Sequence, residues 1–298
     1  MKMEVMGNEY AIQKPKASIE PMKINAARMT NADFAKLSSF IYQQYGIKMP
    51  PIKKTLLESR LHKRLNNLQM SSFKEYIDMI LKSKQSDYEI ISMVNAITTN
   101  KTEFFRESAH FNFLSSHILP AMSEKNNKQV KIWSAGCSSG EEVYTIAMVL
   151  NEFCEQHSEL DYSILGTDIS TDVLDKALTA VYPEERLEGI PLFLKRKYFL
   201  RSKDPVKRTV RVMPQLRKKA NFSRLNFMDA SYPINQTFDV IFCRNVLIYF
   251  DKTTQEKVIR KLCEKLPKGA WLFLGHSESI TDMNLPLEQV KPTIFRKI

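Results

Sequence analysis

The sequence predicts an α/β fold, in which a mainly parallel sheet is covered by helices on both faces and preceded by a smaller all-helical unit. Two observations predict it. Before about residue 100, apolar residues recur at helical spacing, as in the stripe of Leu57, Leu61, Leu65 and Leu68. After residue 130, short apolar runs alternate with amphipathic segments, which is typical of strands connected by helices.

The first 100 residues divide into three parts. Residues 1–23 are polar and without periodicity, so we expect a flexible arm. Residues 24–84 predict a helical domain of three helices, the first capped by Asn31 and the second with Pro51 in its first turn. Residues 85–100 predict a linker helix that opens the main domain, residues 85–298.

The main domain predicts strands at 130–136, 162–168, 220–226, 238–245, 270–276 and 293–298. Helices are expected at 140–157, 170–182 and 253–266, between these strands. The β-branched run "RTVRVM" predicts that residues 183–219 form a small inserted β-subdomain. Ligands of such sheets bind at the carboxyl ends of the strands, where glycine and polar residues gather in this sequence.

Composition limits the partners and the compartment. The formal net charge is +11, which indicates an anionic partner. The four cysteines lack metal-ligand spacing, which argues against a metal or disulfide and favours a reducing cytoplasm. No apolar run is long enough to span a membrane. Eleven basic residues fall in one short segment: Lys195, Arg196, Lys197, Arg201, Lys203, Lys207, Arg208, Arg211, Arg217, Lys218 and Lys219.

The turn at 136–140, "GCSSG", permits two interpretations. It fits the G-x-S-x-G elbow of a hydrolase, with Ser138 as nucleophile, Asp239 or Asp251 as acid and His276 as base. Such an elbow follows several earlier strands, however, whereas this turn follows the first. A glycine turn that cradles a nucleotide fits this position better.

The nucleotide interpretation depends on Asp168, at the end of the second strand. An acid there can accept hydrogen bonds from both hydroxyls of a ribose, although it can also cap the next helix. The sequence lacks G-K-[ST] and G-x-G-x-x-G, so no pyrophosphate site is indicated. An adenosine without a pyrophosphate suits S-adenosylmethionine.

Five motifs now resemble one family. They are "AITTNKTEFFRE" (96–107), "WSAGCSSGEEVYTIA" (133–147), "GTDIS" (166–170), "FDVIFCRNVLIYFD" (238–251) and "GHSES" (275–279). In this order they resemble the CheR-type glutamate methyltransferases of bacterial chemotaxis. The chain departs from the family pattern at Lys101 and Val143, where leucine and proline are usual. The resemblance implies a Rossmann-like S-adenosylmethionine-dependent methyltransferase sheet with an N-terminal all-α domain and a small β insertion.

The resemblance also implies roles for single residues. Asn100, Thr102 and Arg106 would close over the methionine end of S-adenosylmethionine, with Glu142 at its amino group. Arg106 and Tyr249 would act at the transfer point. The full expected cofactor set is Asn100, Thr102, Arg106, Glu142, Asp168, Asn226, Phe227, Arg244 and Asn245. Structural roles stay open: Thr102 can cap a helix, and Glu142 can be a first-turn acid.

The implied reaction is methylation of glutamate carboxylates on chemoreceptors, giving methyl esters. The expected partner is the cytoplasmic helical bundle of the receptor, met by the basic residues Lys53, Arg60, Lys63 and Arg64 and by the insertion at 195–219. We expect a cytoplasmic monomer that neither binds nucleic acid nor inserts into the membrane. Two alternatives remain, a nucleic-acid methyltransferase and a methyltransferase-like regulator without catalytic activity.

Overall fold

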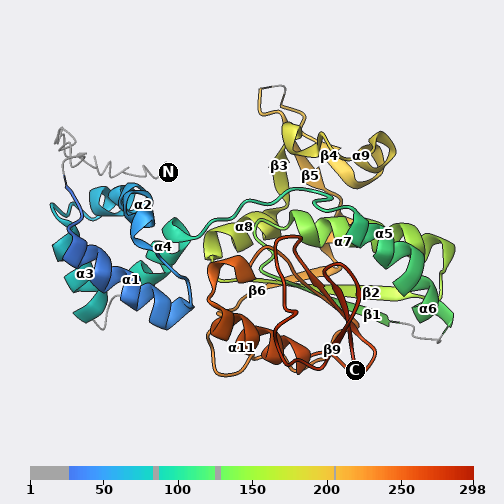
Figure 1. The fold of residues 1–298 in the computed structure, drawn as a ribbon. Helices are drawn as coiled ribbons and strands as arrows, with labels where there is room; N and C mark the ends of the chain where they lie inside the picture. Colours follow the sequence, from blue (N-terminus) through green and yellow to red (C-terminus); the bar gives the residue numbers. More distant parts are fainter. Residues whose placement is uncertain (1–26, 83–86, 125–128, 205) are drawn as a thin grey trace, which may run out of the picture.

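The computed structural model describes residues 27–82, 87–124, 129–204 and 206–298, and the expected arm at 1–23 lies outside these ranges. Figure 1 shows two units side by side, a helical unit in blue and a larger unit built on a sheet. An extended segment between α4 and α5 joins them and runs along the top of the sheet unit. This segment contains the "TTNKTEFFRE" motif.

The helical unit consists of α1 (Asn31–Tyr45), α2 (Lys54–Asn67), α3 (Phe73–Lys82) and α4 (Asp87–Ile97), with a short 3-10 turn at Pro51–Lys53. The expected cap at Asn31 is wrong by one residue. Thr30 caps α1, because its hydroxyl accepts from the Asp33 N–H at 3.0 Å while Asp33 accepts from the Thr30 N–H at 3.2 Å.

The helix α4 packs into the helical unit. Met93, Val94 and Ile97 are buried in the same apolar cluster as Leu61 and Leu65 of α2. Three buried apolar residues on one face give this helix the same source of stability as α1 to α3. The helix that we expected to act as a linker is therefore the fourth helix of this unit.

The main sheet has seven strands in the order β6-β2-β1-β7-β8-β10-β9. Strands β1, β2, β6, β7 and β8 are mutually parallel where they pair, whereas β10 is antiparallel to β8 and to β9. Their bounds are β1 Gln129–Ala135, β2 Asp161–Asp168, β6 Ala220–Arg224, β7 Val240–Cys243, β8 Trp271–Leu274, β9 Leu287–Lys291 and β10 Ile294–Lys297. Strand β9 was not predicted, because this edge strand contains no buried residue.

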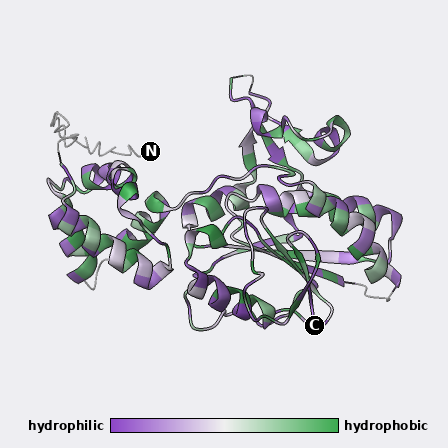
Figure 2. Cartoon of the chain, in the orientation of Figure 1, coloured by the Kyte–Doolittle hydropathy of each residue, from purple (hydrophilic) through white to green (hydrophobic). Residues whose placement is uncertain are grey.

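Helices cover both faces of this sheet, as predicted. Along β1, Val130 and Ile132 join the apolar cluster beneath α7, while Trp133 and Ala135 join the cluster beneath α11. This alternation follows from the two-residue period of a strand. The covering helices, which carry both hydrophobic and hydrophilic residues in Figure 2, are α5 Ala109–Phe113, α6 Leu119–Glu124, α7 Glu141–Gln156, α8 Thr171–Thr179 and α11 Lys252–Cys263, with a π turn at Leu114–Ile118.

The inserted β-subdomain is a three-stranded antiparallel sheet in the order β3-β5-β4, which stands out from the larger unit in Figure 1. It begins two residues before its expected start. Helix α8 ends at Ala180, whose left-handed φ of 53° turns the chain into β3, so the helix expected at 170–182 is too long. The bounds are β3 Val181–Pro183, α9 Leu192–Tyr198, β4 Phe199–Arg201, β5 Thr209–Val212 and α10 Pro214–Arg217.

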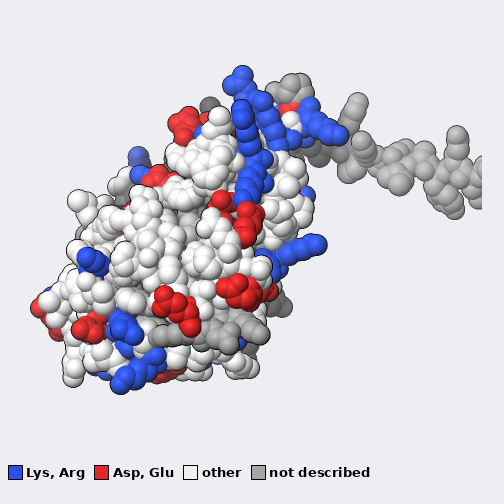
Figure 3. All heavy atoms as spheres, turned by 90° about the vertical axis from the view of Figure 1, so that its right-hand side faces the viewer, with Lys and Arg blue, Asp and Glu red and all other residues white. Residues whose placement is uncertain are grey.

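Part of the basic charge of the subdomain is neutralised within the chain. Lysine and arginine side chains gather at the top of the molecule in Figure 3, where the subdomain stands. Lys197 lies 2.6 Å from both Glu152 and Glu155, and Lys219 forms an ion pair with Asp161. Among the described helices, none has the length and apolar character needed to cross a bilayer.

Candidate functional site

A cavity of about 340 Å³ opens at the carboxyl ends of β1, β2, β6 and β7, and the helical unit supplies part of its wall. This volume is within the range of small-molecule sites. Every residue that the sequence predicted for the site lines it: Asn100, Thr102, Arg106, Glu142, Asp168, Asn226, Phe227, Arg244, Asn245 and Tyr249.

The glycine turn after β1 shapes the floor of the cavity. Gly136 has a φ of +87°, and a Cβ at this position would lie 2.3 Å from the Cγ2 atom of Val246, so only glycine fits. The N–H groups of Gly136 and Cys137 both donate to the Thr167 carbonyl, at 2.7 and 2.9 Å. These bonds fasten the turn to the end of β2 and bring it beside Asp168.

Asp168 is held by the backbone on both sides. Its Oδ2 atom accepts from the Ser138 N–H at 2.9 Å and its Oδ1 atom from the Ser170 N–H at 3.0 Å. Burial raises the pKa of this carboxyl, and the backbone hydrogen bonds oppose that rise. Each oxygen keeps further acceptor capacity, so a side chain with both oxygens fixed at the cavity fits the two hydroxyls of a ribose.

Glu142, in the first turn of α7, is the second carboxylate of the cavity. Ser134 donates a hydroxyl hydrogen bond to its Oε1 atom at 2.7 Å, and the Nη1 atom of Arg244 lies 3.5 Å from its Oε2 atom. Burial raises the pKa of Glu142 more than Arg244 lowers it. A largely desolvated carboxylate with no cation of the described chain closer than 3.5 Å fits the ammonium group of an amino-acid ligand.

Arg244 is buried and contacts two different segments of the site. Its Nη2 atom lies 3.2 Å from the Oε2 atom of Glu107 and donates to the Arg106 carbonyl, and its guanidinium lies 5.3 Å from the centre of the Phe111 ring. It thereby joins the end of β7 to the segment before α5. The sequence analysis missed Glu107, although it directly follows Arg106 in the "FFRE" motif.

Arg106 and Tyr249 have few partners of their own. The Nη1 atom of Arg106 donates to the Lys101 carbonyl at 3.1 Å, and no carboxylate of the described chain lies within ion-pair distance of it. The Tyr249 hydroxyl lies 3.5 Å from the Thr99 carbonyl, and Lys53 lies 6.0 Å from the centre of its ring. Both side chains are half-buried, so both can contact a bound molecule.

The joining segment lies over the glycine turn. The Ser138 hydroxyl donates to the Asn100 carbonyl at 3.0 Å, and Arg186 donates to the Thr102 carbonyl at 2.8 Å. The Ser138 hydroxyl has no other hydrogen-bond partner among the described residues, so Ser138 fastens this segment to the turn. Asp251 caps α11 by accepting from the Thr254 N–H at 2.8 Å. Ser138 and Asp251, two residues of the hydrolase interpretation, therefore have structural contacts in this fold.

The opposite wall of the cavity comes from Asn226 and Phe227. The Asn226 amide donates to the Gln44 carbonyl of α1 at 2.9 Å, which fastens the helical unit to the sheet unit. The Phe227 ring packs edge-on against Phe250, with 6.2 Å between ring centres. An aromatic side chain at this place can pack on a flat heterocycle such as adenine.

The four basic residues expected to form a docking face have different surroundings. Arg64 is paired with Glu89 of α4 and is largely buried, so it belongs to the interior of the helical unit. Arg60 donates to the carbonyls of Ile97 and Thr98 and, like Lys53, lines the cavity. Lys63 is exposed.

The fold defines the class of protein. Five parallel strands in Rossmann-like order, with the antiparallel β10 inserted between β8 and the edge strand β9, form the sheet of S-adenosylmethionine-dependent methyltransferases. Residues 100–295 match the family model described as "CheR methyltransferase, SAM binding domain", and residues 32–98 match "CheR methyltransferase, all-alpha domain". The chain therefore belongs to the CheR methyltransferase family.

Three relatives show how far this similarity extends. The "Chemotaxis protein methyltransferase" of Borreliella burgdorferi is 42% identical over 275 residues, which are 90% of this chain and 95% of the relative. The protein of the same name from Escherichia coli is 35% identical and covers 86% of this chain and 87% of its own length. "Chemotaxis protein methyltransferase 2" of Pseudomonas aeruginosa is 37% identical, covering 89% and 93%.

Proposed function

We propose that this protein transfers a methyl group from S-adenosylmethionine to glutamate side-chain carboxylates of bacterial chemoreceptors, giving methyl esters. The observation that carries the proposal is the meeting of Glu142, Asp168 and Arg106 in one cavity at the strand ends, in a chain of the CheR methyltransferase family. Relatives named chemotaxis protein methyltransferase support the receptor as substrate.

Three charged residues and one aromatic residue of the cavity have a task in this reaction. Asp168 would hold the ribose hydroxyls, Glu142 would pair with the ammonium group and Phe227 would pack on the adenine. When bound, S-adenosylmethionine supplies an activated methyl group on a sulfonium. Arg106 would hold a carboxylate, either that of the cofactor or that of the incoming glutamate, because it has no carboxylate partner of its own among the described residues.

The reaction requires no general base. A free glutamate has a pKa of about 4.3 and is already ionised near neutral pH. The protein instead has to bring this anion into line with the methyl group and to remove its water. Tyr249, half-buried in the cavity wall, would line the transfer point with its hydroxyl.

The receptor would be met by positive charge. Lys63 of α2 and the exposed basic residues of the β-subdomain, such as Arg196 and Lys203, can face acidic receptor helices. We propose that the protein acts in the cytoplasm, as a monomer, on the cytoplasmic helices of the receptor. Binding of this kind weakens as ionic strength rises.

The test is incorporation of a labelled methyl group. Purified protein, radiolabelled S-adenosylmethionine and membranes containing a chemoreceptor should give label on the receptor, released as methanol by mild base. RNA in place of receptor tests the nucleic-acid alternative, and S-adenosylhomocysteine should inhibit. Label on RNA, label stable to base, or no label despite cofactor binding would each contradict the proposal.

A further inference from the structure

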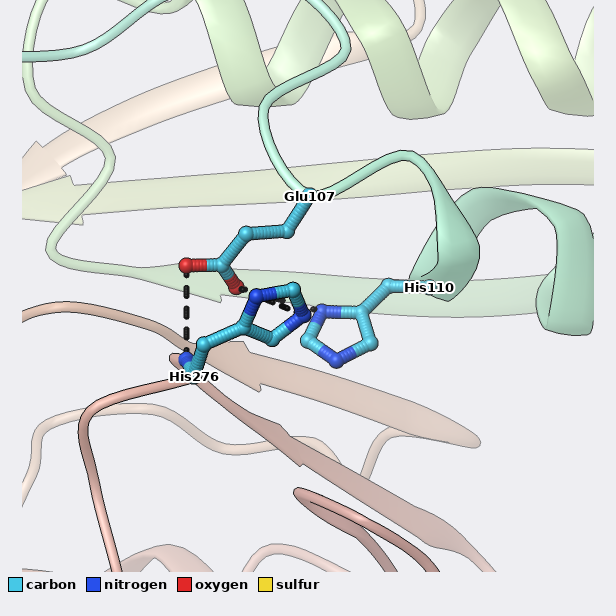
Figure 4. A group of neighbouring side chains, drawn as sticks. All are labelled: Glu107, His110 and His276. Atoms are coloured by element: carbon cyan, nitrogen blue, oxygen red, sulfur yellow. Dashed lines mark hydrogen bonds and ion pairs between the residues drawn. The ribbon is translucent and has the colours of Figure 1, made fainter.

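Three polar side chains converge beside the cavity without lining it. Glu107 precedes α5, His110 lies on α5 and His276 follows β8, and Figure 4 shows their side chains pointing toward one another. The Oε2 atom of Glu107 lies 3.7 Å from the Nδ1 atom of His110 and 3.9 Å from the Nε2 atom of His276. All three donor atoms lie within 4.8 Å of one another.

One nitrogen of the His110 ring has a partner and the other does not. The Nε2 atom of His110 is hydrogen-bonded to the Thr293 hydroxyl, 2.8 Å away. The other nitrogen, Nδ1, faces Glu107.

Two buried atoms of this cluster face each other, His110 Nδ1 and Glu107 Oε2, 3.7 Å apart. Neither of them has a hydrogen-bond partner within the described chain. Unpartnered buried polar atoms such as these need a shared ion or water molecule to satisfy them.

The surroundings leave one Glu107 oxygen for this purpose. Its Oε1 atom accepts from the backbone N–H of His276 and from the Asn245 amide, both at 3.3 Å. Its Oε2 atom has the ion pair with Arg244 at 3.2 Å, whose charge opposes a second cation. Arg244 also faces Glu142 at 3.5 Å, so its charge is shared between two carboxylates.

We propose that Glu107 Oε2, His110 Nδ1 and His276 Nε2 form a binding site for Zn²⁺ or a similar divalent transition metal. Two imidazoles and one carboxylate are a ligand set of zinc, and nitrogen donors disfavour Mg²⁺ and Ca²⁺. Tetrahedral zinc with bonds of about 2.1 Å places its ligand atoms roughly 3.4 Å apart. The observed distances of 3.7 and 3.9 Å need little contraction, and the third pair, between the two histidines, lies within 4.8 Å. His276 has room to adjust, because its side chain is 60% exposed.

The outer contacts of the cluster also fit a metal site. The hydrogen bond between His110 Nε2 and the Thr293 hydroxyl orients the ring, as the outer partner of a metal-bound histidine does. The sequence analysis predicted no metal, because it considered only cysteine spacing. His276 lies more than 160 positions along the chain from Glu107 and His110, so only the fold brings the three together.

The experiment is zinc binding by the full chain. Protein freed of metal with a chelator is titrated with zinc chloride in a calorimeter, without cofactor or receptor. We expect one equivalent to bind, at least tenfold more weakly to the His276→Ala and Glu107→Gln variants. The His117→Ala variant, which removes an exposed histidine outside the cluster, should bind as the wild type does. Circular dichroism verifies that each variant is folded.

Two results would overturn the proposal. The first is an absence of zinc binding by the wild type at micromolar concentration, which would mean that His110 Nδ1 and Glu107 Oε2 share a water molecule instead. The second is equal binding by the wild type and His276→Ala, which would assign the metal to other groups, such as the thiol of Cys154. Neither result bears on methyl transfer, which is measured separately.

Discussion

Replacing Arg106 with alanine tests the proposed reaction most directly. Among the described residues its guanidinium makes one hydrogen bond, to the Lys101 carbonyl at 3.1 Å, within the segment that covers the cavity. A hydrogen bond to a charged partner contributes about 1.5–3 kcal/mol. If Arg106 holds a carboxylate during transfer, its loss lowers kcat/KM by roughly 10- to 150-fold, since each tenfold corresponds to about 1.4 kcal/mol.

The same substitution should leave the fold intact. Arg106 is half-buried and lies in none of the apolar clusters, so truncation opens no core cavity. The assay is the initial rate of methyl transfer to receptor membranes over a range of receptor concentrations, with thermal unfolding of each variant. Arg260→Ala is the matched control, because it removes an exposed arginine of α11 that neither lines the cavity nor belongs to the proposed docking surface.

The dependence on cofactor and receptor separates the two roles of Arg106. A higher KM for S-adenosylmethionine, with kcat retained, would place the guanidinium on the cofactor carboxylate. A lower kcat at saturating cofactor would place it on the incoming glutamate. Turnover equal to that of the wild type would refute both roles.

Three further predictions concern charge and packing. Because burial raises the pKa of Glu142, its carboxylate is protonated at a higher pH than an exposed glutamate, and affinity for S-adenosylhomocysteine should fall as pH decreases. Calorimetry should find a weaker pH dependence of this affinity in Glu142→Gln, and equal pH profiles would contradict the pairing of Glu142 with the ammonium group. Leu61→Ala, at a fully buried position, should cost about 2–5 kcal/mol of unfolding free energy, and an unchanged denaturation midpoint would be inconsistent with the helical core. Lys63→Glu should weaken receptor binding most at low salt, as measured by sedimentation with receptor membranes. Binding equal to that of the wild type would show that α2 is not part of the docking surface.

The sequence predicted the parallel sheet, because buried strands and amphipathic helices leave periods of two and about 3.6 residues in the chain. It failed at β9, whose residues are half-buried or exposed and so carry no apolar period. It ended α8 too late, because the left-handed turn at Ala180 lacks the glycine that usually marks such an end. The role of α4 depended on which core it joins, and that is a tertiary contact.

The motifs by themselves determined the family resemblance, and the resemblance implied the ten site residues. Only the tertiary structure decided how those residues are used. It gave Arg244 two carboxylates to bridge, placed Arg64 in an interior ion pair with Glu89, and left Arg106 without a carboxylate partner among the described residues. Partner choice of this kind depends on distances of a few ångströms between side chains far apart in the chain, and local pattern does not encode such distances.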